Sequence, residues 1–326
     1  MLAAYYSEQG AARDVLRVGE QQTPVPGPGE VRVRLRTSGV NPSDWKVRQG
    51  GFGRGLSAPL VIPHSDGAGD IDAVGPGVAD RRSERVWIWN AQWKRASGTA
   101  AQYVVVPSAQ AVRLPRDVSY AAGACLGIPA LTAMQAVRLA DIGPRTTVLI
   151  AGGAGAVAHY AIQFAKLRGA TVLSTVSSDA KAAHAKGAGA DAVLNYRNED
   201  VGQRIKQLTA GRGVDALIEL DLARNAGLYP SILRPHATVV VYGTSAGEAT
   251  LPALWMMQNS IRLQLFLIYD VSEADRAAGI AELSHWLEEG KLRHAIAQRL
   301  PLERIADAHE IVERGAAIGN VVLDID

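Results

Sequence analysis

A glycine-rich segment near the middle of the chain has the residue types that a phosphate-bearing cofactor requires. It reads Ala151-Gly152-Gly153-Ala154-Gly155-Ala156-Val157-Ala158, in which Gly152, Gly155 and Ala158 recur every third residue. Glycine permits a tight turn and lets the main chain approach a pyrophosphate, and the helix that follows presents free N–H groups. We predict a dinucleotide-binding turn here, with a purely structural turn as the alternative. The residues expected against the cofactor are Gly152, Gly153, Ala154, Gly155, Ala156 and Val157.

The residues after the next predicted strand indicate which dinucleotide would bind. A site for NAD usually has an acidic residue there, which binds the ribose hydroxyls. Here the strand ends at Val176 and the chain continues Ser177-Ser178-Asp179-Ala180-Lys181. Two hydroxyls and a lysine suit a 2′-phosphate, so Ser177, Ser178 and Lys181 favour NADP(H). The same residues also fit a plain helix start, with Ser178 as the cap and Asp179 at the positive end.

The stretches around this turn are typical of a parallel sheet covered by helices. Continuous apolar segments alternate with helix-like segments, as in strands that are buried on both faces. The predicted strands are residues 146–150, 171–176, 192–194, 216–218 and 239–241. This middle zone, about residues 122–264, is expected to be a doubly wound α/β domain.

The two ends of the chain have a different character. Residues 1 to about 121 are rich in Gly and Pro, and residues 31–36 alternate apolar and basic side chains like a half-buried antiparallel strand. The tail predicts helices over 273–289 and 302–314 and a strand at 321–323. It is too short for a domain of its own, so we expect it to pack on the others.

Composition and charge exclude several classes of function. The 326 residues carry 34 basic and 32 acidic side chains, and this net charge of +2 indicates neither nucleic acid nor an anionic membrane as a partner. The single cysteine, Cys125, excludes an intrachain disulfide and a four-cysteine zinc site. No apolar run is long enough to span a bilayer and no signal-peptide pattern opens the chain, so we expect a cytoplasmic protein.

Several short motifs follow one another in a specific order along essentially the whole chain. They are Asn41-Pro42-Ser43-Asp44, Arg48-Gln49-Gly50, Asp66-Gly67-Ala68-Gly69, Arg85-Val86-Trp87, Gly98-Thr99-Ala100-Ala101-Gln102-Tyr103, Gly127-Ile128-Pro129-Ala130-Leu131-Thr132-Ala133, the glycine turn, Asn195-Tyr196-Arg197, Val241-Tyr242-Gly243 and Gly319-Asn320-Val321-Val322-Leu323. In their order and spacing the chain resembles the zinc-independent quinone oxidoreductases, the zeta-crystallin-like branch of the medium-chain dehydrogenase/reductase superfamily.

The resemblance implies a GroES-like β-rich catalytic domain built from residues 1–121 and 265–326, with an inserted Rossmann NADP-binding domain at 122–264. It also implies that Ser177, Lys181 and Tyr196 surround the 2′-phosphate. The other residues that it implies near the cofactor are Thr132, Gly243, Thr244, Phe266, Leu267, Ile268 and Asn320. Residues 266–268 fit a core strand equally well, and Tyr196 fits an ordinary loop aromatic. Relatives of this kind also suggest a homodimer.

Zinc-bearing members of the superfamily use a catalytic Cys, His and acid. By resemblance the histidine position is occupied by Ser65, and the cysteine position near Asn41 has no thiol. His64 is one residue away and has no thiol partner, so we expect no metal ion.

Without a metal or a nucleophile, the chemistry that remains is direct hydride transfer from NADPH to a quinone or enone, with water as a source of the proton. Hydrogen-bond donors near the acceptor oxygen would stabilise its developing negative charge. The nearest donors by resemblance are Asn41, Lys46 and Arg48. Asn41 fits equally a turn residue before Pro42.

Two positions depart from the patterns of relatives. Many quinone oxidoreductases have a tyrosine where this chain has Lys46. Enoyl-thioester reductases use a tyrosine as proton donor near the position of Phe52, and a phenyl ring cannot donate a proton.

Trp87, Trp89 and Trp93 fit either an aromatic acceptor slot or ordinary packing. The alternative functions are an enoyl-thioester reductase and an NADPH-binding sensor or structural protein with little catalysis.

Overall fold

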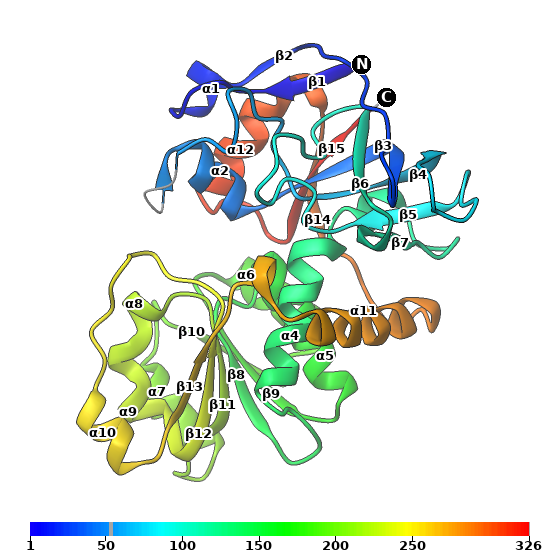
Figure 1. The fold of residues 1–326 in the computed structure, drawn as a ribbon. Coiled ribbons are helices and arrows are strands. Elements are labelled where there is room, and N and C mark those ends of the chain that lie inside the picture. Colours follow the sequence, from blue (N-terminus) through cyan, green and yellow to red (C-terminus); the bar gives the residue numbers. More distant parts are fainter. Residues whose placement is uncertain (52–54, 326) are drawn as a thin grey trace. The chain divides into compact units, whose positions relative to one another are not determined.

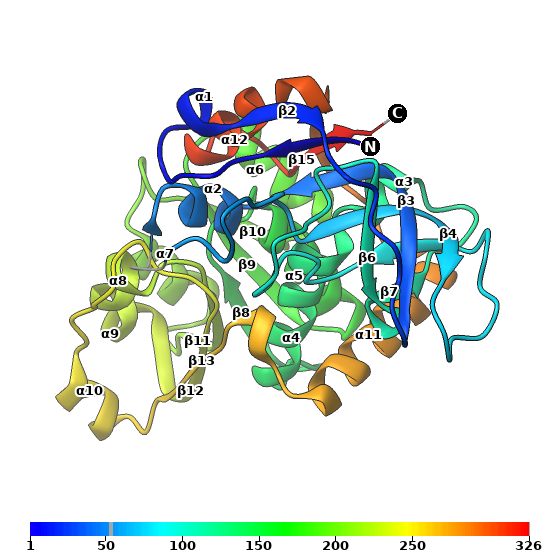
Figure 2. The same cartoon turned by 45° about the horizontal axis from the view of Figure 1, so that its top comes forward.

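The computed structural model describes residues 1–51 and 55–325, and the contacts among them divide the chain into two units. Unit 1 comprises Met1–Pro129, Leu287–Gly290 and His294–Asp326, and unit 2 comprises Ala130–Trp286 and Lys291–Arg293. Both ends of the chain therefore belong to unit 1, and in Figures 1 and 2 the two termini lie close together. In the part of the chain that is described, no helix is both long and apolar enough to cross a bilayer.

Unit 2 is built on a six-stranded parallel sheet. Its strands, in spatial order, are β10 (Ala192–Asn195), β9 (Thr171–Val176), β8 (Thr147–Ile150), β11 (Val214–Glu219), β12 (Leu233–Val241) and β13 (Arg262–Leu265). From β8 the chain adds strands first on one side (β9, β10) and then on the other (β11, β12, β13), so the strand order reverses between β8 and β11. In doubly wound sheets ligands bind beside such a reversal, at the carboxyl ends of the strands. The α/β fold and the five strands predicted for the middle zone are confirmed.

Helices cover both faces of this sheet (Figure 1). One face carries α4 (Leu131–Leu139), α5 (Ala156–Leu167) and α6 (Asp179–Ala188), with α5 in contact with the other two. The other face carries α7 (Val201–Leu208), α8 (Leu222–Asn225) and α9 (Tyr229–Ile232). Leu149, Leu173 and Leu217 point to the second face, where they pack with Ile205 and Tyr229. The unit also contains α10 (Ala253–Gln258) and most of α11 (Glu273–Glu288).

Unit 1 is mainly an antiparallel sheet. The order is β14 (Ile296–Pro301), β15 (Asn320–Asp324), β3 (Glu30–Val40), β4 (Asp66–Val74), β5 (Arg85–Ile88) and β7 (Ala111–Arg113), while β6 (Tyr103–Pro107) also pairs with β3. A separate ribbon joins β1 (Leu2–Tyr5) and β2 (Arg17–Glu20), and the helices are α1 (Ala12–Val15), α2 (Pro42–Arg48), α3 (Tyr120–Gly123) and α12 (Ile305–Glu313). Along β3, Val31, Val33 and Leu35 are buried, which confirms the alternation predicted for residues 31–36.

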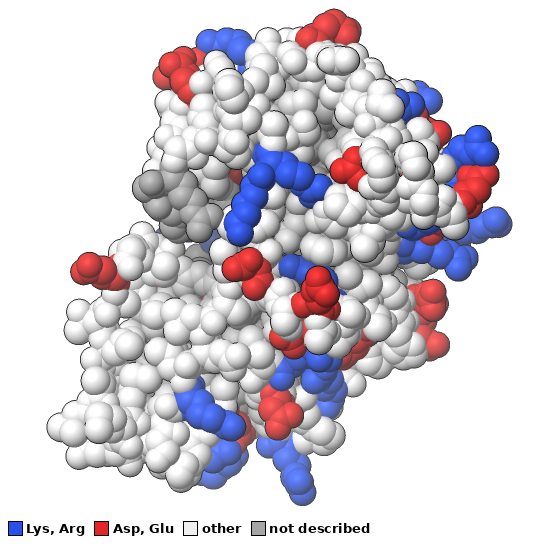
Figure 3. Space-filling view, viewed as in Figure 1, with Lys and Arg blue, Asp and Glu red and all other residues white. Residues whose placement is uncertain are grey.

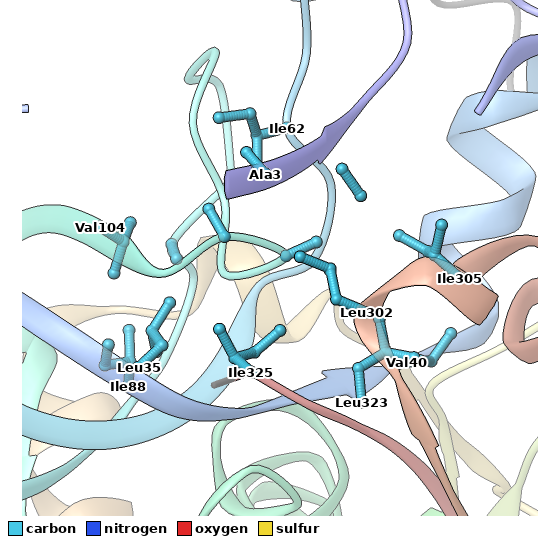
Figure 4. Packing of buried hydrophobic residues seen from close by; sticks show 14 of the residues in the cluster. Ala3, Leu35, Val40, Ile62, Ile88, Val104, Leu302, Ile305, Leu323 and Ile325 are labelled. Carbon is cyan, nitrogen blue, oxygen red and sulfur yellow. The ribbon is translucent and has the colours of Figure 1, made fainter. Parts of the chain in front are cut away.

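The C-terminal tail completes the core of unit 1. Leu302 and Ile305 pack with Leu35 and Val40 of the N-terminal segment, together with Leu323 at the end of the chain (Figure 4). β15 pairs with β3 on one side and β14 on the other, so the last strand lies inside the sheet. The tail is therefore part of this unit rather than a domain of its own.

The division between the units lies later in the chain than the expected boundaries at residues 121 and 265. Residues up to Pro129 stay with unit 1, because Gly127 lies against Asp66 and the carbonyl of Ala124 lies against Gly39. Most of α11 stays with unit 2, because Glu282 pairs with Arg168 at 2.7 Å. These contacts join residues that lie far apart in the sequence, so the local sequence pattern that suggested the boundaries does not contain them.

Candidate active site

The predicted glycine turn connects β8 to α5 beside the reversal of the sheet. Gly152 has a φ of +69°, and a Cβ there would lie 2.3 Å from Leu220 Cδ2. A Cβ on Gly153 would lie 2.2 Å from Ser174 Oγ. Gly155 differs, because a Cβ there would meet only the Gly152 carbonyl oxygen, at 3.3 Å. The positive φ favours glycine at Gly152 and close packing favours it at Gly153, whereas Gly155 leaves an open side at the start of the helix.

Main-chain N–H groups line this open side. The N–H groups of Gly152 and Gly153 bond to the hydroxyl and carbonyl of Thr175, which fixes the turn against β9. Gly155 has φ −75° and ψ 158° and precedes the first residue of α5. The first N–H groups of a helix, here those of Ala156 and Val157, have no partner within the helix. A turn of this shape can bind an anionic phosphate.

The residues predicted for a 2′-phosphate follow the carboxyl ends of two neighbouring strands, β9 and β10. Asn195 is in register with Val176, and Tyr196 donates its N–H to the Val176 carbonyl at 3.1 Å. Lys181 Nζ lies 3.2 Å from Ser177 Oγ, and the Tyr196 ring is exposed. These three side chains could hold a phosphate together.

Ser178 has a structural role in the same segment. Its hydroxyl accepts a hydrogen bond from the N–H of Lys181, three residues later, and so caps α6. This is the helix-start interpretation of the segment. It holds alongside the phosphate interpretation, because the cap uses Ser178 while Ser177 and the Lys181 ammonium lie beside it.

The segment after β11 is held by a buried acid that sequence reasoning missed. Glu219 is buried, and its Oε1 accepts hydrogen bonds from the N–H of Asp221 and the amide of Asn225. Burial raises the pKa of Glu219. The carbonyl of Gly243, two residues after β12, accepts a hydrogen bond from the N–H of Leu222. The only signal in the sequence was a glutamate at the end of an apolar strand.

The remaining cofactor candidates of unit 2 are spread over three segments. Gly243 is packed so closely that a Cβ would lie 2.4 Å from the Leu220 carbonyl oxygen, and Thr244 follows it. Thr132 is buried in α4, and among the described residues its hydroxyl has no hydrogen-bond partner. Residues 266–268 follow β13 instead of extending it, with Leu267 exposed and Ile268 buried. A buried hydroxyl without a partner suits a bound ligand.

In unit 1, Asn41 is held at both its side chain and its main chain. Its Nδ2 donates to Asp66 Oδ2 at 2.8 Å, and its main-chain N–H donates to Asp44 Oδ2 at 2.7 Å. Burial raises the pKa of Asp44 to about 7. Lys46 Nζ lies 5.8 Å from the centroid of the Trp45 ring. Lys46 lies in α2, and Asn41 is the residue directly before this helix, at its N-cap position.

Arg48 and Asn320 are placed differently from the other candidates. The Arg48 guanidinium is fully buried and donates to His309 Nδ1 at 3.3 Å, to Glu313 Oε2 at 3.1 Å and to the Gly10 carbonyl. It points into the core of unit 1, so it is not available to an acceptor oxygen. Asn320 donates its main-chain N–H and its Nδ2 to the Ala295 carbonyl, at 2.8 and 2.9 Å.

The residues near the expected zinc position do not fit a zinc site. Both ring nitrogens of His64 are hydrogen-bonded, to Ser38 Oγ and to His309 Nε2, each at 2.9 Å. Burial raises the pKa of the Cys125 thiol, whose Sγ contacts the Ala121 carbonyl. Within the described ranges, no three His, Cys, Asp or Glu side chains gather as metal ligands. Zinc is bound by three or four thiolates, carboxylates and imidazoles with a free nitrogen.

The tryptophans divide between core and loop. Trp87 lies in β5 and is fully buried, which is ordinary core packing, while Trp89 and Trp93 are half-buried in the following loop. Lys94 Nζ lies 5.3 Å from the Trp93 ring centroid. Phe52 lies outside the described residues.

Two family profiles match the chain, one in each unit. A profile described as "Alcohol dehydrogenase GroES-like domain" matches residues 27–116, and one described as "Zinc-binding dehydrogenase" matches residues 156–284. Human quinone oxidoreductase is 29% identical over 303 residues, which cover 92% of this chain and 90% of the relative. The human synaptic vesicle membrane protein VAT-1 homolog is 30% identical over 322 residues, covering 92% and 80% respectively.

Solved structures agree over the full length. A structure named NAD-dependent alcohol dehydrogenase has a TM-score of 0.90 and 29% identity, with all of both chains covered. Escherichia coli quinone oxidoreductase complexed with NADPH has a TM-score of 0.86 and 26% identity, covering 99% of this chain and 100% of that one. The fold, the profiles and the relatives agree: the chain belongs to the medium-chain dehydrogenase/reductase superfamily of oxidoreductases, with quinone oxidoreductases among its homologues.

Proposed function

We propose that the protein is an NADPH-dependent reductase that transfers a hydride, without a metal ion, to quinones or related α,β-unsaturated carbonyl compounds. The observation that carries the proposal is the glycine turn at the reversal of the sheet, with Ser177, Lys181 and Tyr196 beside it. The names of the relatives, quinone oxidoreductases among them, support it.

The chain's own residues would bind and orient the cofactor. The N–H groups at the start of α5 would bind the pyrophosphate, and Ser177 and Lys181 the 2′-phosphate. Thr132, with its buried hydroxyl, would bind the nicotinamide end. When bound, NADPH supplies the hydride from C4 of its nicotinamide ring.

On the acceptor side, Asn41 and Lys46 are the donors that we retain. Asp66 fixes the Asn41 amide, so this amide is preorganised before an acceptor arrives. Asn41 and Lys46 would stabilise negative charge on the acceptor oxygen, after which water supplies the proton. Arg48 does not have this role, because its guanidinium is buried and bonded.

Turnover of NADPH with a panel of quinones, enones and crotonyl-type thioesters tests this function. We expect oxidation of NADPH with quinones or enones and little with thioesters. NADPH binding without turnover across the whole panel would favour a sensor or structural role. Preference for thioesters would favour an enoyl-thioester reductase.

Lys181 is expected to determine the preference for NADPH over NADH. A charge-assisted hydrogen bond contributes about 1.5–3 kcal/mol, which corresponds to roughly a 10- to 100-fold change in binding. Lys181→Ala should therefore raise the KM for NADPH by about this factor and leave the KM for NADH unchanged. Lys186→Ala, on the same helix but exposed, is the matched control and should change neither value. Equal losses for both dinucleotides in Lys181→Ala would contradict this role.

We also propose that the protein forms a homodimer through the β13 edge of unit 2. β13 is the last strand of its sheet, and Leu254, Met257 and Leu265 nearby are 68%, 76% and 59% exposed. An open strand edge with exposed apolar side chains favours pairing with a second chain. Light scattering should give the mass of a dimer, and Leu265→Glu should reduce it to that of a monomer. Val25→Glu alters an apolar residue of unit 1 that is 79% exposed, and it should leave the dimer intact.

A further inference from the structure

A line of buried polar side chains crosses unit 1 and has no part in the chemistry described above. Arg48 Nε is 3.3 Å from His309 Nδ1, and His309 Nε2 is 2.9 Å from His64 Nε2. His64 Nδ1 is 2.9 Å from Ser38 Oγ, which is 2.8 Å from Thr99 Oγ1. The Thr99 hydroxyl donates to the main-chain carbonyl of Asp66. All five of these side chains, from Arg48 to Thr99, belong to residues that are 0% exposed.

Arg48 determines the direction of every hydrogen bond in this line. A guanidinium only donates, so His309 must accept at Nδ1 and carry its proton on Nε2. His64 must then accept at Nε2 and carry its proton on Nδ1. Ser38 accepts from His64 and donates to Thr99, and Thr99 donates to Asp66. One arrangement of protons satisfies the whole line, with both imidazoles neutral and in opposite tautomers.

The electrostatics of the pair agree with this arrangement. Burial lowers the pKa of His64 to about 3. Burial, together with the neighbouring His64 and Arg48, holds the pKa of His309 well below its usual value. A proton added to His64 would put two opposed donors at the Nε2···Nε2 contact, and a proton added to His309 would put its Nδ1–H against the Arg48 Nε–H.

The line does not offer a path for protons. One end is a guanidinium, which does not release a proton at working pH, and the other end is a peptide carbonyl. What the line reaches is Asp66, whose carboxylate accepts the Asn41 Nδ2 at 2.8 Å. Asn41, the donor that the proposed function places beside the acceptor, is thus linked to the core of the unit through Asp66, which is hydrogen-bonded at both its main chain and its side chain.

The backbone at His64 is strained in a way that supports a role for its ring. Its φ is +77°, a region in which residues with a Cβ are uncommon. Such a conformation persists only where the surroundings hold it. Here the Thr99 N–H bonds to the His64 carbonyl at 3.0 Å, and Gly98 packs so closely that a Cβ would lie 2.2 Å from that oxygen.

We propose that His64 and His309 are positioning residues for the acceptor site. Fixed in opposite neutral tautomers, they hold Thr99 and the Asp66 main chain, and through Asp66 they orient the Asn41 amide. The inference about the acceptor rests on the proposed function, in which Asn41 faces the acceptor oxygen. The tautomer arrangement does not depend on that function.

Nitrogen-15 NMR of the imidazoles in the full-length protein tests the arrangement without any substrate. We expect the His64 signals of a neutral ring protonated on Nδ1 and the His309 signals of one protonated on Nε2, both unchanged from pH 8 to pH 5. His64→Asn, whose side chain tolerates a positive φ and has a donor near the Nδ1 position, assigns the signals. Titration of either ring in this range, or the same tautomer in both, would overturn the proposal.

Two threonine variants test the connection to the acceptor. Thr99→Val removes the hydroxyl that holds Asp66, and we expect the KM for the acceptor to rise about 3- to 10-fold, as for one lost hydrogen bond, with the KM for NADPH unchanged. Thr37→Val is the matched control, because Thr37 is also buried and donates to a main-chain carbonyl of unit 1, that of Tyr120, at 2.7 Å.

The outcomes of this comparison separate the two levels of the argument. Equal effects of Thr99→Val and Thr37→Val on the acceptor KM, or none from either, would overturn the positioning role. If the unaltered protein failed to oxidise NADPH with every acceptor of the panel, the proposed function would be wrong. The tautomer measurement would still decide whether the imidazole pair is fixed as described.

Discussion

Replacing Gly155 by valine is expected to remove NADPH binding while the fold remains intact. Gly155 has φ −75° and ψ 158°, which valine adopts readily, and a Cβ there meets only the Gly152 carbonyl oxygen, at 3.3 Å. The branched side chain would instead occupy the open side of the turn, where the pyrophosphate must approach main-chain N–H groups. Losing two hydrogen bonds to a charged group, at about 1.5–3 kcal/mol each, corresponds to at least about a 100-fold weaker Kd.

The measurement is the rise in NADPH fluorescence on titration with protein, alongside a thermal melt. Gly187→Ala is the control, since Gly187 lies in α6 with nothing within 4 Å of an added Cβ. The Gly187→Ala protein should bind NADPH as tightly as the unaltered protein, and its melting temperature should be the same or higher because alanine favours a helix more than glycine does. Unaltered binding by a folded Gly155→Val protein would show that the phosphates lie elsewhere.

Acid is expected to destabilise the protein steeply below pH 6.5. Burial lowers the pKa of His64 to about 3 and that of His159 to about 4, and it holds the pKa of His309 well below its usual value. Below pH 6.5 the unfolded chain binds a proton at each of these histidines and the folded chain does not. Their stabilising contribution is therefore lost as the pH falls, by about 1.4 kcal/mol per pH unit for each histidine and about 4 kcal/mol for the three.

Two buried acids act in the opposite direction. Burial raises the pKa of Asp44 to about 7 and also raises the pKa of Glu219. Between about pH 4 and pH 7 the folded state therefore retains a proton on Asp44 that the unfolded chain releases, and Glu219 acts in the same direction above its unfolded pKa. Each acid offsets up to about 1.4 kcal/mol per pH unit. The three histidines outnumber the two acids, so the net free energy of unfolding still falls with acid, by about 1.4 kcal/mol per pH unit well below pH 6.5.

Urea unfolding at pH 7, 6 and 5 measures this dependence, and His64→Asn isolates one contribution. The slope of stability against pH should be about 1.4 kcal/mol per pH unit smaller in His64→Asn than in the unaltered protein. His285→Asn alters an exposed histidine and should leave the slope unchanged. The same slope in all three proteins would contradict the burial of a neutral imidazole at position 64.

Much of unit 2 could be predicted because its signals are local. A strand, a glycine turn and a helix follow one another within residues 147–167, and the turn needs glycine at Gly152 and Gly153 for reasons that the structure makes explicit. The same locality explains why Ser178 supported two interpretations. A helix cap and a neighbouring phosphate site both call for short hydroxyl side chains after a strand.

Arg48 shows why other candidates could not be placed from the sequence. Its partners His309 and Glu313 lie 261 and 265 residues later in the chain. A pattern read along neighbouring residues contains no information about such pairs. An arginine near Asn41 therefore suggested a donor for the acceptor, whereas its guanidinium belongs to the core. The contact between His64 and His309, 245 residues apart, was hidden for the same reason.

Isothermal titration of the purified protein with NADPH and, separately, with NADH tests the central claim most directly. The account predicts saturable uptake of NADPH and binding of NADH at least about 10-fold weaker, because only NADPH carries the phosphate that Ser177 and Lys181 would hold. No heat from NADPH, or affinity for NADH that equals or exceeds it, would contradict the account.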